Sequence, residues 1–133
     1  MTPKEMYTEI ILDYYNNPKN FGTLDKPDIK FKDVNPACGD IVEITAKVNK
    51  NRIEDIKFKG NGCAISLASA EILAEHLKGK NIEDIKKLNK EDVLNILNVD
   101  LSPLRLKCAL LPLKVFKLGL YNYLGKTLEE ENE

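Results

Sequence analysis

The chain has 133 residues, of which 43% are hydrophobic and 31% are charged, with 20 Lys and Arg against 21 Asp and Glu. This size and composition are typical of one compact domain with its own apolar core, and they exclude a disordered chain. The balanced charge argues against a nucleic-acid-binding surface, and no apolar run approaches the ~20 residues that span a bilayer. We therefore expect a single domain over residues 1–133 that is cytoplasmic and has no nucleic-acid or membrane partner.

The first half of the chain predicts one short helix followed by an antiparallel sheet. Residues 2–5 (TPKE) have the pattern of a helix-capping box, and Asn16-Asn17-Pro18 ends the helical spacing that follows. Residues 29–34 give a weak strand signal, and two stronger strands flank the turn Asn49-Lys50-Asn51. The expected apolar positions of the helix are Tyr7, Ile10, Ile11 and Tyr14, and those of the two stronger strands are Val42, Ile44, Ala46, Val48, Ile56 and Phe58.

The second half of the chain predicts helices. Residues 64–78 have helical apolar spacing and are followed by Gly79, a residue that commonly ends helices. Asn81 and Asn89 are expected to cap two further short helices. The order of helix, strands and helices predicts an α+β fold, with helices packed on one face of a small three-stranded antiparallel sheet.

The last helix is expected over residues 108–124, with Gly125 ending it. Pro112 fits this prediction, because a proline is tolerated in the first turn of a helix, where its missing N–H costs nothing. Residues 126–133 are acidic, and we expect them to form a frayed tail.

Three cysteines in a chain of this kind favour reduced thiols that perform metal or sulfur chemistry over a disulfide framework. Cys38, Cys63 and Cys108 each fall at a junction beside a predicted strand or helix, and such junctions can meet at one end of a domain. Gly39 allows Cys38 and Asp40 to turn toward a common point, which makes them a plausible chelating pair. The expected position of Cys63 at a helix N-terminus favours its thiolate, the form that binds metal.

The ligand set of three thiolates and one carboxylate suits either tetrahedral zinc or an iron-sulfur cluster, and it does not choose between them. A hard aspartate oxygen on an iron site should bind more weakly than a fourth thiolate would, which would ease the release of a cluster. The spacing of the cysteines lacks a paired C-x-x-C signature. Cys108, which lies between Leu106 and Leu110, could therefore also be a buried apolar residue.

Four motifs of the chain resemble those of the IscU/NifU-type iron-sulfur scaffold family, in a match that runs from Tyr7 to about Leu124. The motifs are DYYNNPKNFG (13–22), PACGD (36–40), GNGCAIS (60–66) and RLKC (105–108). The resemblance implies an IscU/SufE-like fold and a scaffold, rather than an enzyme, that receives sulfur from a cysteine desulfurase. Such a scaffold also takes up iron, builds a [2Fe-2S] cluster and transfers it to apo-proteins.

Carried over to this chain, the resemblance makes Cys38, Asp40, Cys63 and Cys108 the ligands of the cluster, with Cys108 as the first sulfur acceptor. Two features depart from the IscU pattern. Lys107 stands where IscU proteins usually have histidine, and it is closer to the SufU branch, whose members bind zinc and accept sulfur. Ser102 replaces one proline of the segment by which IscU proteins engage a dedicated Hsp70-type chaperone, and this argues against chaperone-assisted transfer.

The sequence alone therefore leaves three candidate functions open. They are a cluster scaffold, a zinc-bound SufU-like sulfur acceptor with a sulfurtransferase-like role, and a structural zinc module for protein interaction. The usual SufU insertion between the second and third cysteines has little room here, which favours the scaffold. The sequence leaves open whether the chain works as a monomer or as a homo-oligomer.

Overall fold

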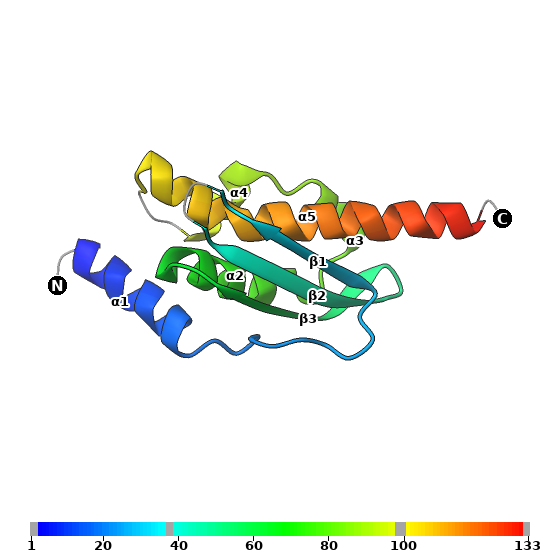
Figure 1. Cartoon of the computed structure of the whole chain (residues 1–133), viewed down its shortest axis with the longest axis horizontal. Coiled ribbons are helices and arrows are strands. Elements are labelled where there is room, and N and C mark those ends of the chain that lie inside the picture. Colours follow the sequence, from blue (N-terminus) through cyan, green and yellow to red (C-terminus); the bar gives the residue numbers. More distant parts are fainter. Residues whose placement is uncertain (1–2, 37–38, 98–100, 132–133) are drawn as a thin grey trace.

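The computed structural model describes residues 3–36, 39–97 and 101–131. Three strands and five helices follow one another in the order that the sequence predicts (Figure 1). They are α1 (Pro3–Asn16), β1 (Ile29–Val34), β2 (Ile41–Asn49), β3 (Arg52–Asn61), α2 (Ala64–Leu77), α3 (Ile82–Lys86), α4 (Lys90–Leu97) and α5 (Pro103–Glu131). No helix within the described residues is both long enough and apolar enough to cross a membrane.

The sheet is antiparallel, with the strands in the order β1-β2-β3. The hairpin between β2 and β3 turns at Lys50 and Asn51, whose positive φ values of 51° and 64° are those of a type I′ turn. Five of the six predicted inward-facing positions, Val42, Ile44, Ala46, Ile56 and Phe58, are buried, and Val48 is partly buried. The three-stranded antiparallel sheet is therefore confirmed.

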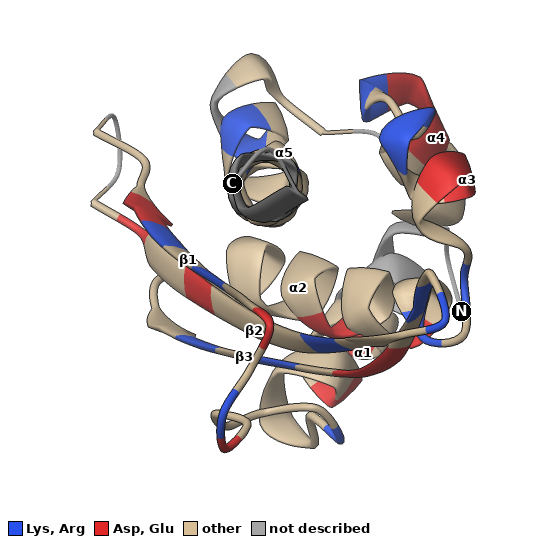
Figure 2. Cartoon of the chain, turned by 90° about the vertical axis from the view of Figure 1, so that its right-hand side faces the viewer, with Lys and Arg blue, Asp and Glu red and all other residues tan. Residues whose placement is uncertain are grey.

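Helices α2 and α5 cover the same face of this sheet and pack against each other (Figure 2). The approach of α5 to β1 requires Gly119, because a Cβ built there would lie 2.9 Å from the Cβ of Phe31. Phe58 and Phe116 lie at the centre of the apolar core, and both are fully buried. The predicted α+β architecture is confirmed, and it places the N-terminus of α2 beside the start of α5.

The predicted apolar face of α1 is wrong in part. Ile11 is buried, with 6% of its surface exposed, but Ile10 is 52% exposed and Tyr14 is 36% exposed. Within the described residues, the main contact of helix α1 is with α2, so only a narrow stripe of the helix is covered. The capping box at residues 2–5 and the side chain of Tyr7 lie outside the described residues.

The predicted caps of α3 and α4 are confirmed. The side chain of Asn81 accepts a hydrogen bond of 2.8 Å from the N–H of Glu83. At the start of α4, the side chain of Asn89 accepts from the N–H of Asp92, and the side chain of Asp92 accepts from the N–H of Asn89. This reciprocal pair satisfies two backbone donors that a helix end leaves open.

The predicted bounds of the last helix are wrong. Helix α5 begins at Pro103 and continues through Gly125 to Glu131, so Pro112 lies in its interior. Ser102 caps this helix, because its carbonyl accepts from the N–H of Leu106 at 2.9 Å. Pro103 then occupies the first helical position, where proline is favoured. Whether the last turns fray remains a prediction.

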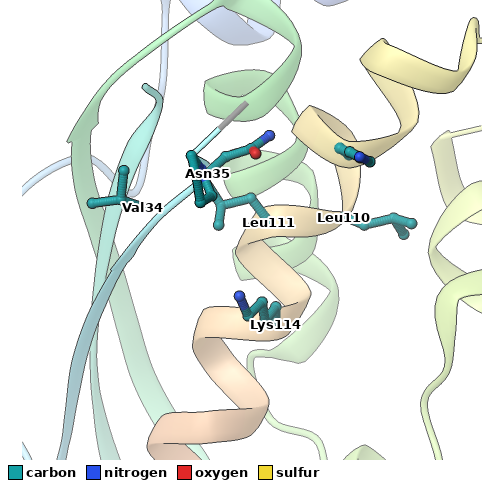
Figure 3. Close-up of a pocket in the computed structure, with 7 residues that line it drawn as sticks. Val34, Asn35, Leu110, Leu111 and Lys114 are labelled. Atoms are coloured by element: carbon teal, nitrogen blue, oxygen red, sulfur yellow. The ribbon is translucent and has the colours of Figure 1, made fainter. Parts of the chain in front are cut away.

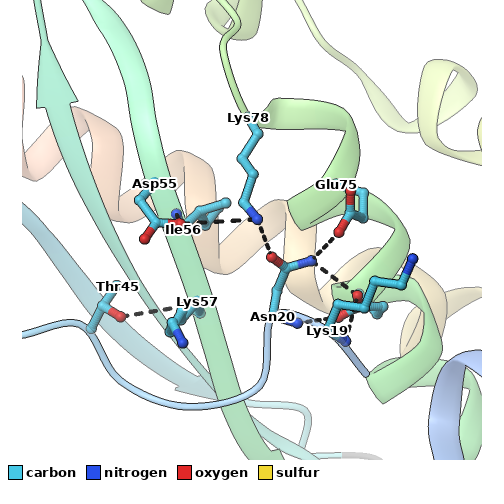
Figure 4. Close-up of polar contacts among 9 residues, drawn as sticks. Lys19, Asn20, Thr45, Asp55, Ile56, Lys57, Glu75 and Lys78 are labelled. Atoms are coloured by element: carbon cyan, nitrogen blue, oxygen red, sulfur yellow. Dashed lines mark hydrogen bonds and ion pairs between the residues drawn. The ribbon is translucent and has the colours of Figure 1, made fainter. Parts of the chain in front are cut away.

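A buried polar network ties the segment after α1 to helix α2 (Figure 4). The carboxylate of Glu71, which is 2% exposed, accepts from the backbone N–H groups of Lys19 and Asn20 at 2.9 and 3.0 Å. The side-chain amide of Asn20 donates to Glu71 and Glu75, and its carbonyl oxygen accepts from Lys78. We call these residues, Asn20, Glu71, Glu75 and Lys78, the Asn20 network.

The backbone around Asn20 also forms hydrogen bonds with β3 at the edge of the sheet. The carbonyl of Asn20 accepts from the N–H of Phe58 at 2.9 Å, and the carbonyl of Phe58 accepts from the N–H of Gly22 at 2.8 Å. Phe21 and Phe58 therefore form a short parallel bridge, and their rings meet edge to face with centroids 5.6 Å apart. The segment after α1 thus covers an edge that β3 would otherwise leave open.

Candidate metal centre

The described residues of the first predicted ligand motif, Pro36, Gly39 and Asp40, lie between β1 and β2. The N–H of Asn35 donates to the carbonyl of Asp40 at 2.8 Å, and the N–H of Gly39 donates to the carbonyl of Asn35 at 2.7 Å. Gly39 has a φ of +75°, a conformation that is costly for any residue with a side chain. These two bonds close the loop and fix Asp40 immediately before β2.

Cys63 lies at the N-cap of α2, as the sequence predicts, and it contacts Asp40 twice. The backbone N–H of Cys63 donates to Oδ1 of Asp40 at 3.1 Å, and its Sγ lies 3.3 Å from Oδ2. Gly62 makes this approach possible, because a Cβ there would lie 2.8 Å from Cγ of Asp40. Because Gly62 has no side chain, the segment that carries Cys63 can pack directly against Asp40.

Cys108 completes the group from helix α5. The ligand atoms of Asp40, Cys63 and Cys108 all lie within 4.8 Å of one another. Asp40 is 4% exposed and Cys108 is 2% exposed, whereas Cys63 is half-buried. The structure thus brings together three of the four predicted ligands, from residues up to 68 positions apart in the chain (108 minus 40). Cys38 lies outside the described residues.

The chemistry of this group fits a thiophilic metal. Two thiols and one carboxylate become anions when they bind a metal, and a cation between them would offset their mutual repulsion in a nearly closed site. Tetrahedral zinc with Zn–S bonds of about 2.3 Å places neighbouring ligand atoms roughly 3.7 Å apart. A group within 4.8 Å needs only a small contraction to hold one such ion, and it must open further to hold a two-iron core.

Two buried serines of α2 belong to the surroundings of this site, and the sequence analysis missed them. Ser66 donates to the carbonyl of Cys63 at 3.1 Å, and its Oγ lies 3.8 Å from the Cys63 Sγ. Ser69 donates to the carbonyl of Ala109 on α5 at 2.6 Å. Both serines interrupt an alanine-rich run of the helix, and this polar interruption was the signal available in the sequence.

A pocket of about 460 Å³ opens beside the centre, between the end of β1 and the start of α5 (Figure 3). Val34, Leu110 and Leu111 give it apolar walls, and Lys107 and Lys114 add two cations. Lys107 is exposed toward this pocket, whereas the Sγ of Cys108, the next residue, lies among Asp40 and Cys63. A role of Lys107 in stabilising sulfur on Cys108 remains a prediction.

Lys114 forms an ion pair of 3.1 Å with Asp33. The N–H of Val34 and the Lys114 ammonium hold the pKa of Asp33 below its ordinary value. This pKa is lower in the folded chain than in the unfolded chain, so the ionised Asp33 stabilises the fold. The stabilisation is complete at pH values above the pKa that Asp33 has in the unfolded chain. The contribution disappears as the pH falls through the lowered value.

We expect Lys114→Met to lower the free energy of unfolding by less than about 1 kcal/mol at neutral pH, since the pair is partly exposed. The difference from wild type should shrink toward zero in acid. Urea unfolding over a series of pH values measures this. A difference that persists unchanged after Asp33 is protonated would show that Lys114 acts by packing instead.

Comparison with known proteins agrees with this geometry. The sequence matches the family model described as the NifU-like N terminal domain over residues 6–130. The chain belongs to this family. The family assignment that the four motifs predicted is therefore confirmed, and so is the predicted fold, because solved structures of the same family have it.

Three members of the family illustrate its range. The iron-sulfur cluster assembly enzyme IscU of Drosophila melanogaster is 37% identical over 125 residues, which span 91% of this chain and 80% of the relative. The zinc-dependent sulfurtransferase SufU of Bacillus subtilis is 33% identical over 86% of this chain and 89% of its own. FiSufU of Fervidobacterium islandicum, a proposed cluster-assembly scaffold of the SUF system, superimposes with a TM-score of 0.74 at 29% identity. The superposition covers 90% of this chain and 99% of FiSufU.

Proposed function

We propose that this chain is a scaffold on which an iron-sulfur cluster is built and from which it is transferred to apo-proteins. The observation that carries the proposal is the convergence of Asp40, Cys63 and Cys108 within 4.8 Å in a member of the NifU-like N-terminal family. The cluster is the cargo of such a protein, and a [2Fe-2S] core suits a site with four ligands.

Cys38 is the proposed fourth ligand. Chain connectivity limits its reach, because two residues span at most about 7 Å between α carbons and Asp40 is the second residue after it. The described part of its loop is closed by the two hydrogen bonds of Asn35. A thiolate at this position would add a third soft sulfur ligand, which iron favours.

A cysteine desulfurase is the proposed sulfur donor, and Cys108 is the proposed first acceptor. The burial of Cys108 adds a condition, since a thiol that is 2% exposed cannot meet a donor until its surroundings move. Of the two cysteines that the structure describes, Cys63 is half-buried and Cys108 is buried. Sulfur delivery and opening of the site are therefore linked in this proposal.

The alternative function is that of a zinc-bound sulfur acceptor that stimulates a desulfurase. Two observations favour it: the compact group fits a single tetrahedral ion, and the Bacillus subtilis relative is named a zinc-dependent sulfurtransferase. Both functions use Cys108 as the acceptor. They differ in whether iron and sulfide accumulate on the chain.

A structural zinc module is the third function considered. The apolar core built around Phe58 and Phe116 argues against it, because this core lies between the sheet and two helices and needs no metal to form. We expect a chelator to strip the metal without unfolding the chain. Location in the cytoplasm and action without a dedicated chaperone remain predictions.

Anaerobic incubation of the chain with ferrous iron, cysteine, a desulfurase and a thiol reductant, which reduces the persulfide sulfur to sulfide, tests the scaffold function. We expect visible sulfur-to-iron absorption to develop, and we expect it to pass to an apo-ferredoxin added afterwards. Cys63→Ser should abolish the absorption, because it removes a thiolate from the centre of the group. A colourless protein that retains zinc and passes sulfur through Cys108 would instead support the zinc-bound acceptor.

A further inference from the structure

Helices α2 and α5 are joined by one buried hydrogen bond next to the candidate centre. The hydroxyl of Ser69 donates to the carbonyl of Ala109 at 2.6 Å, at the short end of the usual range. Both residues are almost completely buried, at 1% and 0% exposure. Ala109 directly follows Cys108, so this bond holds the backbone that carries a proposed ligand.

This bond lies about one turn before Pro112, in the interior of α5. Pro112 has no N–H group, so it cannot donate the helical hydrogen bond to the carbonyl of Cys108, four residues earlier. The ring of a proline inside a helix also crowds the carbonyl four residues earlier, which here is that of Cys108. Ser69 donates from the neighbouring helix to the next carbonyl along the chain, that of Ala109.

The surroundings of Ser69 require no hydroxyl for packing. Its neighbours Ala68, Ala70 and Ala74 are buried within the same helix, where alanine is the most favoured residue. A buried hydroxyl costs free energy unless it is hydrogen-bonded, so a serine here is useful only for the bond it makes. The same helix carries Ser66, which donates to the carbonyl of Cys63 at 3.1 Å.

We propose that Ser69 is a positioning residue that holds Cys108 against Asp40 and Cys63 by fixing the carbonyl of Ala109 across the interface between α2 and α5. This inference rests on the proposed function, because it takes these three side chains as metal ligands. Ser69 itself does not touch the metal. It sets the separation of two cysteines that come from different helices.

Zinc affinity, measured by competition with a chromophoric chelator, tests the role of Ser69. We expect Ser69→Ala to weaken zinc binding by roughly tenfold, as removal of an outer support of a metal site does. Ser69→Thr and Ser69→Val form a matched pair with the same shape, and only the threonine keeps the hydroxyl. We expect the valine variant to bind more weakly than the threonine variant by a similar factor.

Val93→Ala provides the control for lost stability, because Val93 is buried on α4, a helix that contributes none of the three grouped ligands. We expect this variant to unfold more easily while its zinc affinity stays within about threefold of wild type. If Ser69→Ala binds zinc as tightly as wild type, or no more weakly than Val93→Ala, the proposal is wrong. The same holds if the threonine and valine variants bind alike.

Alkylation of the metal-free chain separates this inference from the proposed function. We expect Ser69→Ala to speed the reaction of iodoacetamide with Cys108 severalfold and to leave Cys63 unchanged, since only the α5 cysteine loses its support. Unchanged reactivity of Cys108 would count against the inference. Because this comparison needs no metal, it decides the role of Ser69 even if wild-type protein builds no cluster and the scaffold function fails.

Discussion

Replacing Glu71 by alanine is expected to lower the free energy of unfolding by about 3–5 kcal/mol, because it leaves buried donors without an acceptor. The carboxylate of Glu71 accepts from the N–H groups of Lys19 and Asn20 and from the side chain of Asn20. Glu71 is 2% exposed, so water cannot easily replace it. Urea unfolding followed by circular dichroism measures the loss.

Glu75→Ala is the matched control for this prediction. Glu75 is exposed and accepts a single hydrogen bond, of 2.7 Å, from the same Asn20 side chain. We expect its loss to cost about 1 kcal/mol or less, because water can take its place. Equal losses in the two variants would show that burial of Glu71 does not govern the strength of the Asn20 network.

Replacing Asp40 by alanine is expected to lengthen the lifetime of an assembled cluster. Asp40 supplies the one oxygen in a group whose other members are sulfur, and a hard oxygen holds iron less firmly than thiolate does. Without it, the cluster should leave the scaffold more slowly. The decay of visible absorption in the presence of an iron chelator gives the lifetime.

Asp33→Ala is the control for the loss of a carboxylate near the centre. Asp33 lies on β1 and pairs with Lys114, outside the group formed by Asp40 and the two cysteines. Its removal should leave the cluster lifetime unchanged. The Asp40→Ala substitution also removes the acceptor of the hydrogen bond from the N–H of Cys63. A shortened lifetime would show that Asp40 stabilises the site, against the role proposed for it.

The sheet could be predicted from the sequence because its strands have one buried face. Alternation at Val42, Ile44 and Ala46 fixes which side of β2 faces the helices, and a slip by one residue would turn these side chains to the other face. The same reasoning failed for α1. Its apolar residues outnumber the positions that α2 covers, so spacing alone could not show that Ile10 and Tyr14 are exposed.

The last helix shows how competing local signals mislead. Gly125 and Pro112 both suggested a short helix, but packing of α5 along the sheet and α2 outweighs the propensity of single residues. Ser102-Pro103 was the better signal for its start, because serine is a favoured cap and proline a favoured first residue. The sequence analysis had considered that segment only as a chaperone-binding motif.

The convergence of Asp40, Cys63 and Cys108 was predicted from the motifs, and the structure brings these three residues together. Their supports were not predicted, because hydrogen bonds such as that of Ser69 to Ala109 depend on which helix faces meet. The Asn20 network was missed for the same reason, since it joins residues 51 positions apart (71 minus 20). Pairings at this distance leave no periodic signal in the chain.

The metal and acid-labile sulfide content of protein purified without air tests the scaffold function most directly. We expect iron and sulfide in equal amounts, with both lost in Cys63→Ser and Cys108→Ser. Stoichiometric zinc without sulfide, before and after incubation with ferrous iron, cysteine, a desulfurase and a thiol reductant, would contradict the scaffold function and support the zinc-bound sulfur acceptor.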